Sequence, residues 1–231
     1  RWVNEVFVEK GTAGTSGLSI AESFYIQKYE VTQAEFQELM GYNPSEFGGK
    51  PNNPVEQVTW YDAVMYANKL SEAEGLKPYY TISGEVYAEN PKRITSATVT
   101  ENTSANGYRL PTEQQWEYAA RGGNKSNNYT YSGSNNYDDV AWVWENNTTN
   151  GETYGTKAVG RKQANELGIY DMSGNVWEWT NSLWSSGDTY RVLRGGSCRD
   201  GYASRATVTG KYGYDPGNYF NGLGFRLVRS Y

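Results

Sequence analysis

At three places where apolar residues then recur at helical spacing, a threonine is followed three residues later by an acidic or amide side chain. This spacing lets the threonine hydroxyl accept a backbone hydrogen bond at a helix start while the later side chain bonds back to the threonine N–H. The pairs, each with a glycine that follows the helical pattern, are Thr32 and Glu35 with Gly41, Thr59 and Asp62 with Gly75, and Thr112 and Gln115 with Gly122. Because glycine readily ends a helix in the left-handed conformation, the sequence predicts three short capped helices.

Extended segments are predicted to be short and scattered. β-Branched and aromatic residues favour strands over 24–31, 192–194 and 224–230. In the last segment, Phe225 and Leu227 alternate with charged residues that include Arg226, which is typical of a strand with an apolar and a charged face. Residues 122–166 are rich in Asn, Gly, Ser and Tyr and are predicted to form a long ordered loop. The pattern indicates an α+β fold of low regular content, with residues 1–231 forming one domain.

Histidine is absent from the chain, and cysteine occurs once, as Cys198. These absences exclude a Ser–His or Cys–His nucleophile pair, a histidine-ligated zinc or iron site and an internal disulfide. Without a basic helper or a second thiol, Cys198 is interpreted as a chance occupant rather than a reactive group. The net charge of −5 is spread along the chain, which argues against nucleic acid or an anionic membrane as partner. No apolar stretch approaches the ~20 residues that span a bilayer.

Six sequence blocks spread over nearly the whole chain carry a family likeness. They read FYIQKYEVTQAEF at 24–36, PVEQVTWYDAVMYANKL at 54–70, YRLPTEQQWEYAARGG at 108–123, ELGIYDMSGNVWEWT at 166–180, RVLRGGS at 191–197 and GFRLVRS at 224–230. In sequence and in order these blocks resemble those of the formylglycine-generating-enzyme (sulfatase-modifying factor) family. The resemblance implies the C-type-lectin-like fold of that family, which agrees with short capped helices and long loops.

The same resemblance bears on catalysis. Oxidase members of the family use two cysteines, shortly after the RGGS block, to bind copper and convert a substrate cysteine to formylglycine. Here the positions nearest to that pair fall around Asp200 and Arg205, within the stretch CRDGYASRATV. The family's iron-dependent sulfoxide synthases need histidine ligands. We therefore expect no enzyme. A formylglycine-generating-type oxidase, or another enzyme or maturation factor of the family, is the alternative; a calcium-dependent sugar binder is disfavoured, since its Glu-Pro-Asn or Gln-Pro-Asp loop is missing.

One non-catalytic subset of the family varies a C-terminal segment that ends near GFR. These are the variable proteins of diversity-generating retroelements, and a Treponema variable protein is the example that the chain resembles. Residues 198–222 resemble such a variable segment, although a diverged constant loop is the alternative. The resemblance implies a monomeric, receptor- or adhesin-like protein that binds a protein or other surface ligand. It also implies an extracellular or bacterial cell-surface location, with a lipid anchor supplied by a leader.

Aromatic and charged side chains of this segment, together with Trp184, are expected to form the binding surface, because aromatics give contact area and charges give orientation. The predicted ligand-binding residues are Trp184, Asp200, Tyr202, Arg205, Tyr212, Tyr214, Asp215, Tyr219 and Phe220. Trp177 and Trp179 are expected in the core, whereas Trp184 fits either place equally well. Replacing Tyr212 and Tyr214 by alanine is expected to change the melting temperature by only a few degrees.

Four residues, Asp171, Gly174, Val176 and Glu178, match a calcium site of the family. Two carboxylates with backbone carbonyls between them offer the hard oxygen ligands that Ca²⁺ prefers. In the alternative, Glu178 pairs inside a tryptophan-rich core while Asp171 faces solvent. The sequence therefore predicts a structural calcium ion and no required cofactor.

Overall fold

The computed structural model describes residues 3–231, and within them the three predicted helices are confirmed. They are α1 (Gln33–Met40), α2 (Trp60–Ala73) and α3 (Glu113–Ala120). Each begins directly after its predicted threonine, with both hydrogen bonds of a capping box in place. Gly41 ends α1 in the left-handed conformation, with φ at 80°. Local cap chemistry therefore determines where these helices begin.

The other helical segments are single turns. They are α4 (Tyr137–Val140) and the 3-10 turns η1 (Gly123–Lys125), η2 (Trp144–Asn146), η3 (Thr149–Gly151) and η4 (Ala203–Ala206). All but η4 lie within 122–166, so that segment is a long loop as predicted. Hydrogen bonds from side chains replace regular backbone pairing there. The Asn146 side chain accepts from the Val143 N–H and donates to the Ala141 carbonyl. Such bonds satisfy backbone groups that would otherwise be buried without partners.

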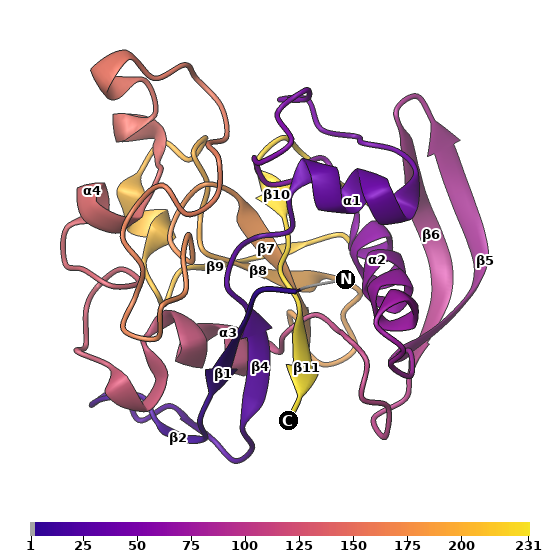
Figure 1. Cartoon of the computed structure of the whole chain (residues 1–231), viewed down its shortest axis with the longest axis horizontal. Coiled ribbons are helices and arrows are strands. Elements are labelled where there is room, and N and C mark those ends of the chain that lie inside the picture. The colour runs from indigo at the N-terminus through magenta and orange to yellow at the C-terminus, as the bar shows by residue number, and fades with distance from the viewer. Residues whose placement is uncertain (1–2) are drawn as a thin grey trace.

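A small antiparallel sheet brings the two ends of the described chain together (Figure 1). Its strands are β1 (Glu5–Val8), β4 (Phe24–Gln27) and β11 (Val228–Ser230), with β4 in the middle. Ile26 lies opposite both Val6 and Val228. A short hairpin, β2 (Gly11–Thr12) with β3 (Ser19–Ile20), connects β1 to β4.

A second sheet, in the order β10-β7-β8-β9, carries part of the C-terminal segment at its edge. Its strands are β7 (Trp177–Leu183), β8 (Arg191–Arg194), β9 (Lys211–Tyr214) and β10 (Leu223–Gly224). β10 pairs with β7 in parallel, and the other neighbours are antiparallel. The segment 198–222 therefore leaves the sheet after β8, returns as the edge strand β9 and re-enters at β10.

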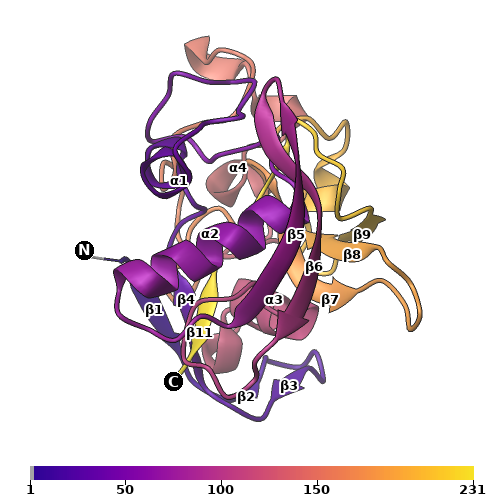
Figure 2. The ribbon, with the colours of Figure 1, turned by 90° about the vertical axis from the view of Figure 1, so that its right-hand side faces the viewer.

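A long β-hairpin, β5 (Tyr80–Glu89) with β6 (Lys92–Glu101), is missing from the sequence predictions. It runs alongside α2, as Figure 2 shows. Apolar residues alternate with polar ones only over short stretches, such as Ala97 and Val99 in β6, and most side chains of the hairpin are exposed or only partly buried, so the half-buried strand pattern is weak. The Thr and Val residues of β6 were the available signal, because β-branched side chains favour strands.

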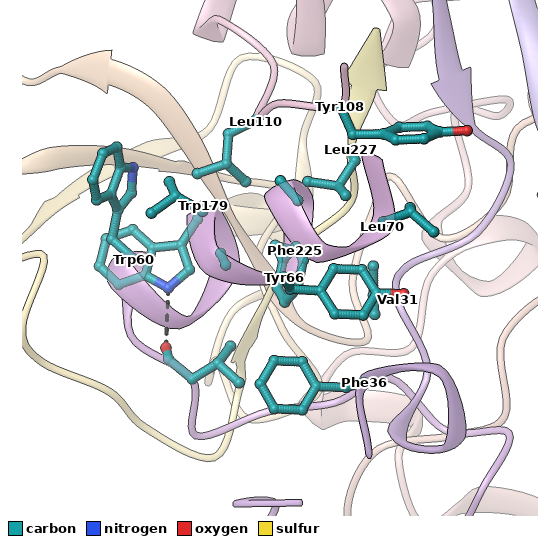
Figure 3. Close-up of a cluster of buried hydrophobic side chains, with 14 of the residues drawn as sticks. Val31, Phe36, Trp60, Tyr66, Leu70, Tyr108, Leu110, Trp179, Phe225 and Leu227 are labelled. Atoms are coloured by element: carbon teal, nitrogen blue, oxygen red, sulfur yellow. Dashed lines mark hydrogen bonds between the residues drawn. The ribbon is translucent and has the colours of Figure 1, made fainter. Parts of the chain in front are cut away.

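The main core lies between α1, α2 and the second sheet (Figure 3). The Tyr66 and Phe225 rings meet edge to face, with centroids 5.4 Å apart. Trp179 donates its indole N–H to the Val58 carbonyl at 3.0 Å. Trp177 and Trp179 are both buried, as expected. Aromatic residues from the six sequence blocks thus pack together in the core.

The predicted alternation of apolar and charged residues over 224–230 places Arg226 at the surface, and this is wrong. Phe225 and Leu227 are buried, but Arg226 is 0% exposed rather than directed to solvent. The backbone leaves β10 after Gly224 and forms β11 only from Val228, so the residues between them are not part of a two-faced strand. The Arg226 guanidinium lies inside the protein.

Candidate functional site

The stretch after the RGGS block contains a thiol that cannot react at the surface. Cys198 is fully buried, and its carbonyl accepts from the Asn147 side chain at 2.7 Å. Burial raises the pKa of the Cys198 thiol to about 12. Because the thiolate is the nucleophile and metal ligand, a buried protonated thiol supplies neither function. Cys198 therefore serves packing.

Asp200 and Arg205, which fall near the family's cysteine pair, form a turn with an ion pair. Asp200 Oδ2 accepts from the Ser197 backbone N–H at 2.7 Å and from its hydroxyl at 2.9 Å. Asp200 Oδ1 lies 3.2 Å from Arg205 Nη1. The Arg205 side chain is 56% exposed, so the pair contributes little stability. Asp200 holds the turn, and Arg205 remains accessible to a partner.

Four of the nine predicted ligand-binding side chains are strongly exposed aromatics. They are Tyr202 (68%), Tyr212 (55%), Trp184 (44%) and Tyr219 (41%), called the aromatic set below. Tyr219 packs its ring on the Arg93 guanidinium of β6, with Cζ 3.6 Å from the ring centroid. Exposed aromatic rings bury large areas at low entropic cost when a partner covers them.

Trp184 is positioned by the edge strand β9. A Cβ atom at Gly213 would lie only 2.8 Å from the Trp184 ring, so Gly213 leaves the space that the indole occupies. Lys211, two residues before Gly213, lies 5.5 Å from the ring centroid and 3.4 Å from Glu113 Oε2. The structure thus places Trp184 on the surface against β9, not in the core.

Tyr214, Phe220 and Asp215 are less available than predicted. Tyr214 and Phe220 are partly buried and pack against the main core, with their rings 5.4 Å apart and edge to face. Tyr214 also lies 6.2 Å from the buried Trp179 ring. Asp215 Oδ1 accepts from the Gly217 N–H at 2.8 Å and holds a turn. These three residues support the surface more than they form it.

Tyr212 and Tyr214 should consequently differ when each is replaced by alanine. We expect Tyr214→Ala to lower the free energy of unfolding by about 2 kcal/mol, because it opens a gap beside Trp179 and Phe220. Tyr212→Ala should change it by less than about 0.5 kcal/mol, since that ring is mostly exposed. Urea unfolding followed by circular dichroism measures both, and equal losses would contradict the different placement of the two rings.

A second group of exposed aromatics comes from the long loop and is missing from the sequence predictions. Trp144 and Tyr154 are 53% and 38% exposed, and their rings lie 5.5 Å apart. The Tyr154 hydroxyl accepts from Arg199 Nε at 3.1 Å, and Arg199 also donates to Asn221. The loop therefore contacts the start of the C-terminal segment, and Arg199 links that contact to Asn221 near the segment's end. Aromatic residues in a polar loop were the only signal, and sequence alone does not show whether such rings are buried.

Glu178 forms a buried ion pair with Arg226. Arg226 donates to both Glu178 oxygens, with Nη2 2.7 Å from Oε1 and Nε 2.8 Å from Oε2. Trp116 donates its indole N–H to Oε2 at 2.7 Å. Both oxygens of Glu178, one of the four predicted calcium ligands, thus accept hydrogen bonds within the protein, which is the pairing in a tryptophan-rich core that the alternative described.

Asp171 is buried, not solvent-facing, and keeps one carboxylate oxygen free. Oδ2 accepts from the Gly160 N–H at 2.7 Å, whereas Oδ1 is buried without a hydrogen-bond partner. Burial raises the Asp171 pKa to about 6, and burial together with Asp171 and Glu178 raises the Glu30 pKa. Three buried carboxyl groups thus lie within electrostatic reach of one guanidinium, and Asp171 Oδ1 has no hydrogen-bond partner among the described residues. Among residues 3–231, however, no three acidic, cysteine or histidine side chains gather as a metal-binding group.

Comparison with known proteins identifies a matching family. Residues 6–231 match the sulfatase-modifying factor enzyme 1-like domain. The chain is 46% identical to the chaperone protein LppX of Paenibacillus barcinonensis, over 97% of this chain and 89% of that protein. It is 30% identical to the formylglycine-generating enzyme of Streptomyces coelicolor, over 80% of this chain but only 55% of the enzyme. The chain therefore spans about half the length of that enzyme relative.

The fold has a close counterpart among solved structures. Treponema denticola variable protein 1 superposes with a TM-score of 0.82, at 28% identity, over 99% of this chain and 95% of that one. Among the described residues, no helix is both long and apolar enough to cross a membrane.

Proposed function

The chain belongs to the family of proteins with a sulfatase-modifying factor enzyme 1-like domain, and on that premise we propose that it is a non-catalytic protein that binds a protein partner through its aromatic set. The observation that carries the proposal is the exposure of Trp184, Tyr202, Tyr212 and Tyr219 on a densely packed scaffold. The C-type-lectin-like fold expected from the resemblance and the likeness to a Treponema variable protein are both confirmed.

The names of two relatives support binding as the activity. The most extensive sequence match reported above is called a chaperone, which acts by contacting other polypeptides. The structural counterpart is called a variable protein. Both span nearly the full chain, so they share its scaffold and not merely one motif. A preorganised scaffold binds without the cost of ordering itself, and exposed aromatic rings then supply most of the contact energy.

The test compares capture of proteins from the source organism's extracellular and envelope fractions by two purified variants. Replacing Tyr202, Tyr212 and Tyr219 together by serine should reduce capture of a specific partner by about tenfold or more, because exposed aromatics are typical binding hot spots. The matched control replaces Phe7, Tyr87 and Tyr231, which are exposed elsewhere, and should retain capture. Equal loss in both triple variants, or no loss in the first, would refute the aromatic set as the binding site.

The alternative function is a formylglycine-generating-type oxidase, which the enzyme relative favours. That chemistry uses two cysteines in this family, whereas the chain has one, and it is buried. The discriminating assay incubates the copper-loaded protein with a cysteine-containing peptide under oxygen and measures aldehyde formation by mass spectrometry. We expect no aldehyde; its formation, followed by loss on Cys198→Ser, would establish the alternative.

We also propose that calcium binds at Asp171, whose Oδ1 has no partner. In this proposal the backbone carbonyls of Gly174 and Val176 are further calcium ligands, while Glu178 keeps its ion pair with Arg226. Without calcium, the raised pKa of Asp171 means that the folded protein binds a proton more tightly than the unfolded chain. This contribution to stability, about 3 kcal/mol for roughly two pKa units, is therefore gained as pH falls from about 7 to 4 and lost as pH rises through about 6.

Calcium should reverse this pH dependence by favouring the ionised carboxylate. We expect the melting temperature at about pH 7.5 to be several degrees higher in millimolar Ca²⁺ than in EDTA. This is the effect of a ligand whose concentration is about 100 times its Kd. Asp171→Asn should abolish the shift and the Asp171 part of the pH dependence, and asparagine tolerates the φ of 57° at this position. An identical melting temperature in Ca²⁺ and EDTA would exclude calcium as a stabilising ion.

For location and assembly, we propose a monomer displayed at the outer surface of the cell through a lipid anchor. The relation to a variable protein with this scaffold supports display. Protease treatment of intact cells should remove the protein, and light scattering should give the mass of one chain. Protection from protease until lysis would contradict surface display.

A further inference from the structure

Beside the C-terminal segment lies a cleft of about 310 Å³ that the proposed function does not use. Ala97 and Val99 of β6 form one wall, Leu183 at the end of β7 and Pro216 form others, and Trp60 and Arg191 also line it. In β6 the partly buried Ala97 and Val99 alternate with exposed Ser96 and Thr98, so the hairpin turns a small apolar face to the cleft. Leu183 is 41% exposed.

Arg191 supplies a positive charge that no carboxylate of the described residues balances by direct pairing. Its guanidinium stacks over the Trp60 ring with Cζ 4.1 Å from the centroid, and Nη1 donates to the Asn181 carbonyl at 2.7 Å. No salt bridge to Arg191 is formed within residues 3–231. Burial lowers its pKa, which shows that its charged form lacks part of the solvation it has in water. An incoming anion would restore that stabilisation.

Asp188 lines the cleft and Glu101 acts on Arg191 electrostatically, but both carboxylates accept hydrogen bonds from other groups. Asp188 Oδ1 accepts from the Thr189 and Tyr190 N–H groups. Glu101 accepts from the Asn181 amide and the Tyr79 hydroxyl. Arg191 thus stays free to receive an external carboxylate while these groups keep their places.

We propose that this cleft binds the C-terminal residue of a polypeptide that ends in an apolar side chain. Such a residue carries a carboxylate and an apolar group on the same carbon, which matches a guanidinium set among Ala97, Val99 and Leu183. An aspartate or glutamate side chain, by contrast, carries no apolar group on the carbon next to its carboxylate. The volume suits one residue and not a folded segment. The inference rests on the proposed function only in taking a polypeptide as the partner.

The test titrates the protein with N-acetyl-leucine and, separately, with N-acetyl-leucinamide, which lacks the carboxylate. Binding is followed by the NMR shift of the Trp60 indole N–H, which donates to the Thr180 carbonyl beneath the stacked Arg191. We expect N-acetyl-leucine to bind at least about ten times more tightly than N-acetyl-leucinamide. Added salt should weaken the binding of N-acetyl-leucine only. Equal affinity of the two probes, or binding of neither, would overturn the proposal.

Two variants locate the effect. Arg191→Met should abolish the preference for the acid, whereas Arg191→Lys should retain part of it because the charge remains. Leu183→Ser alters an exposed side chain, so the fold stays intact, and it should weaken both probes. Unchanged binding of the acid in Arg191→Met and Leu183→Ser would place the probe elsewhere and refute the cleft. The Tyr202, Tyr212 and Tyr219 variant should still bind the acid, so failure of the proposed function and failure of this inference are distinguishable.

Discussion

Replacing Arg226 by methionine should lower the free energy of unfolding by about 3–5 kcal/mol, because it leaves the Glu178 carboxylate buried without its cation. Glu178 is 1% exposed and Arg226 is 0% exposed, so water cannot substitute for the guanidinium. Arg226 also donates to the Tyr170 carbonyl at 2.8 Å, which would lose this partner. Glu30 and Asp171 would lose the one cation that lowers the pKa of both by direct attraction. The free energy of unfolding of a domain is about 5–15 kcal/mol in total, so the variant would approach unfolding at growth temperature.

The matched control is the double variant Arg226→Met with Glu178→Gln. It removes both charges, so it should recover a large part of the loss, whereas two unrelated defects would add. The deficit of the single variant should also shrink as pH falls toward about 5, since the buried Asp171 carboxyl, whose pKa is raised to about 6, then binds a proton and no longer needs the cation. Guanidinium unfolding at several pH values measures both effects. A double variant no more stable than Arg226→Met would show that the lost hydrogen bonds, and not the stranded charge, dominate.

The parts of the fold that sequence predicts are those set by neighbours along the chain. Thr32, Thr59 and Thr112 begin helices because the cap and its partner lie three residues apart, within one turn. Arg226 and the β5–β6 hairpin depend on residues far away in sequence. Arg226 is buried because Glu178, 48 residues away, receives it. The hairpin is held along α2 with many side chains exposed, which leaves only a short apolar alternation to detect.

The candidate site divides in the same way. Composition identified Tyr202, Tyr212 and Tyr219 as surface aromatics because Tyr in a Gly- and Asn-rich segment favours binding loops. It could not separate Tyr212 from Tyr214, which lie two residues apart on the same face of one edge strand and differ through the packing of Trp179 and Phe220 on Tyr214. Burial on a strand is set by what lies across the sheet, and that information is tertiary.

Gly174 should prove essential for a steric reason, whatever its carbonyl binds. Its φ is +79°, and a Cβ there would lie 2.4 Å from the Trp142 carbonyl oxygen and 2.8 Å from the Trp142 nitrogen. Both are backbone atoms, so they cannot rotate away as a side chain would. The Trp142 carbonyl also accepts from the Asn175 N–H at 2.8 Å, so displacing it breaks a buried bond. We expect Gly174→Ala to cost about 3 kcal/mol or more, from left-handed strain, the clash and the lost bond together.

Gly168→Ala is the matched control for this prediction. Gly168 has nearly the same φ, +80°, but no atom lies within 4 Å of its Cβ position, so alanine there adds backbone strain of only about 1–2 kcal/mol. Thermal unfolding of the two variants therefore separates strain from contact. Equal losses would mean that the loop around Trp142 yields freely. A larger loss at Gly174 would show that the loop carrying Trp144 and Tyr154 is fixed rigidly to the core, as a preorganised binding surface requires.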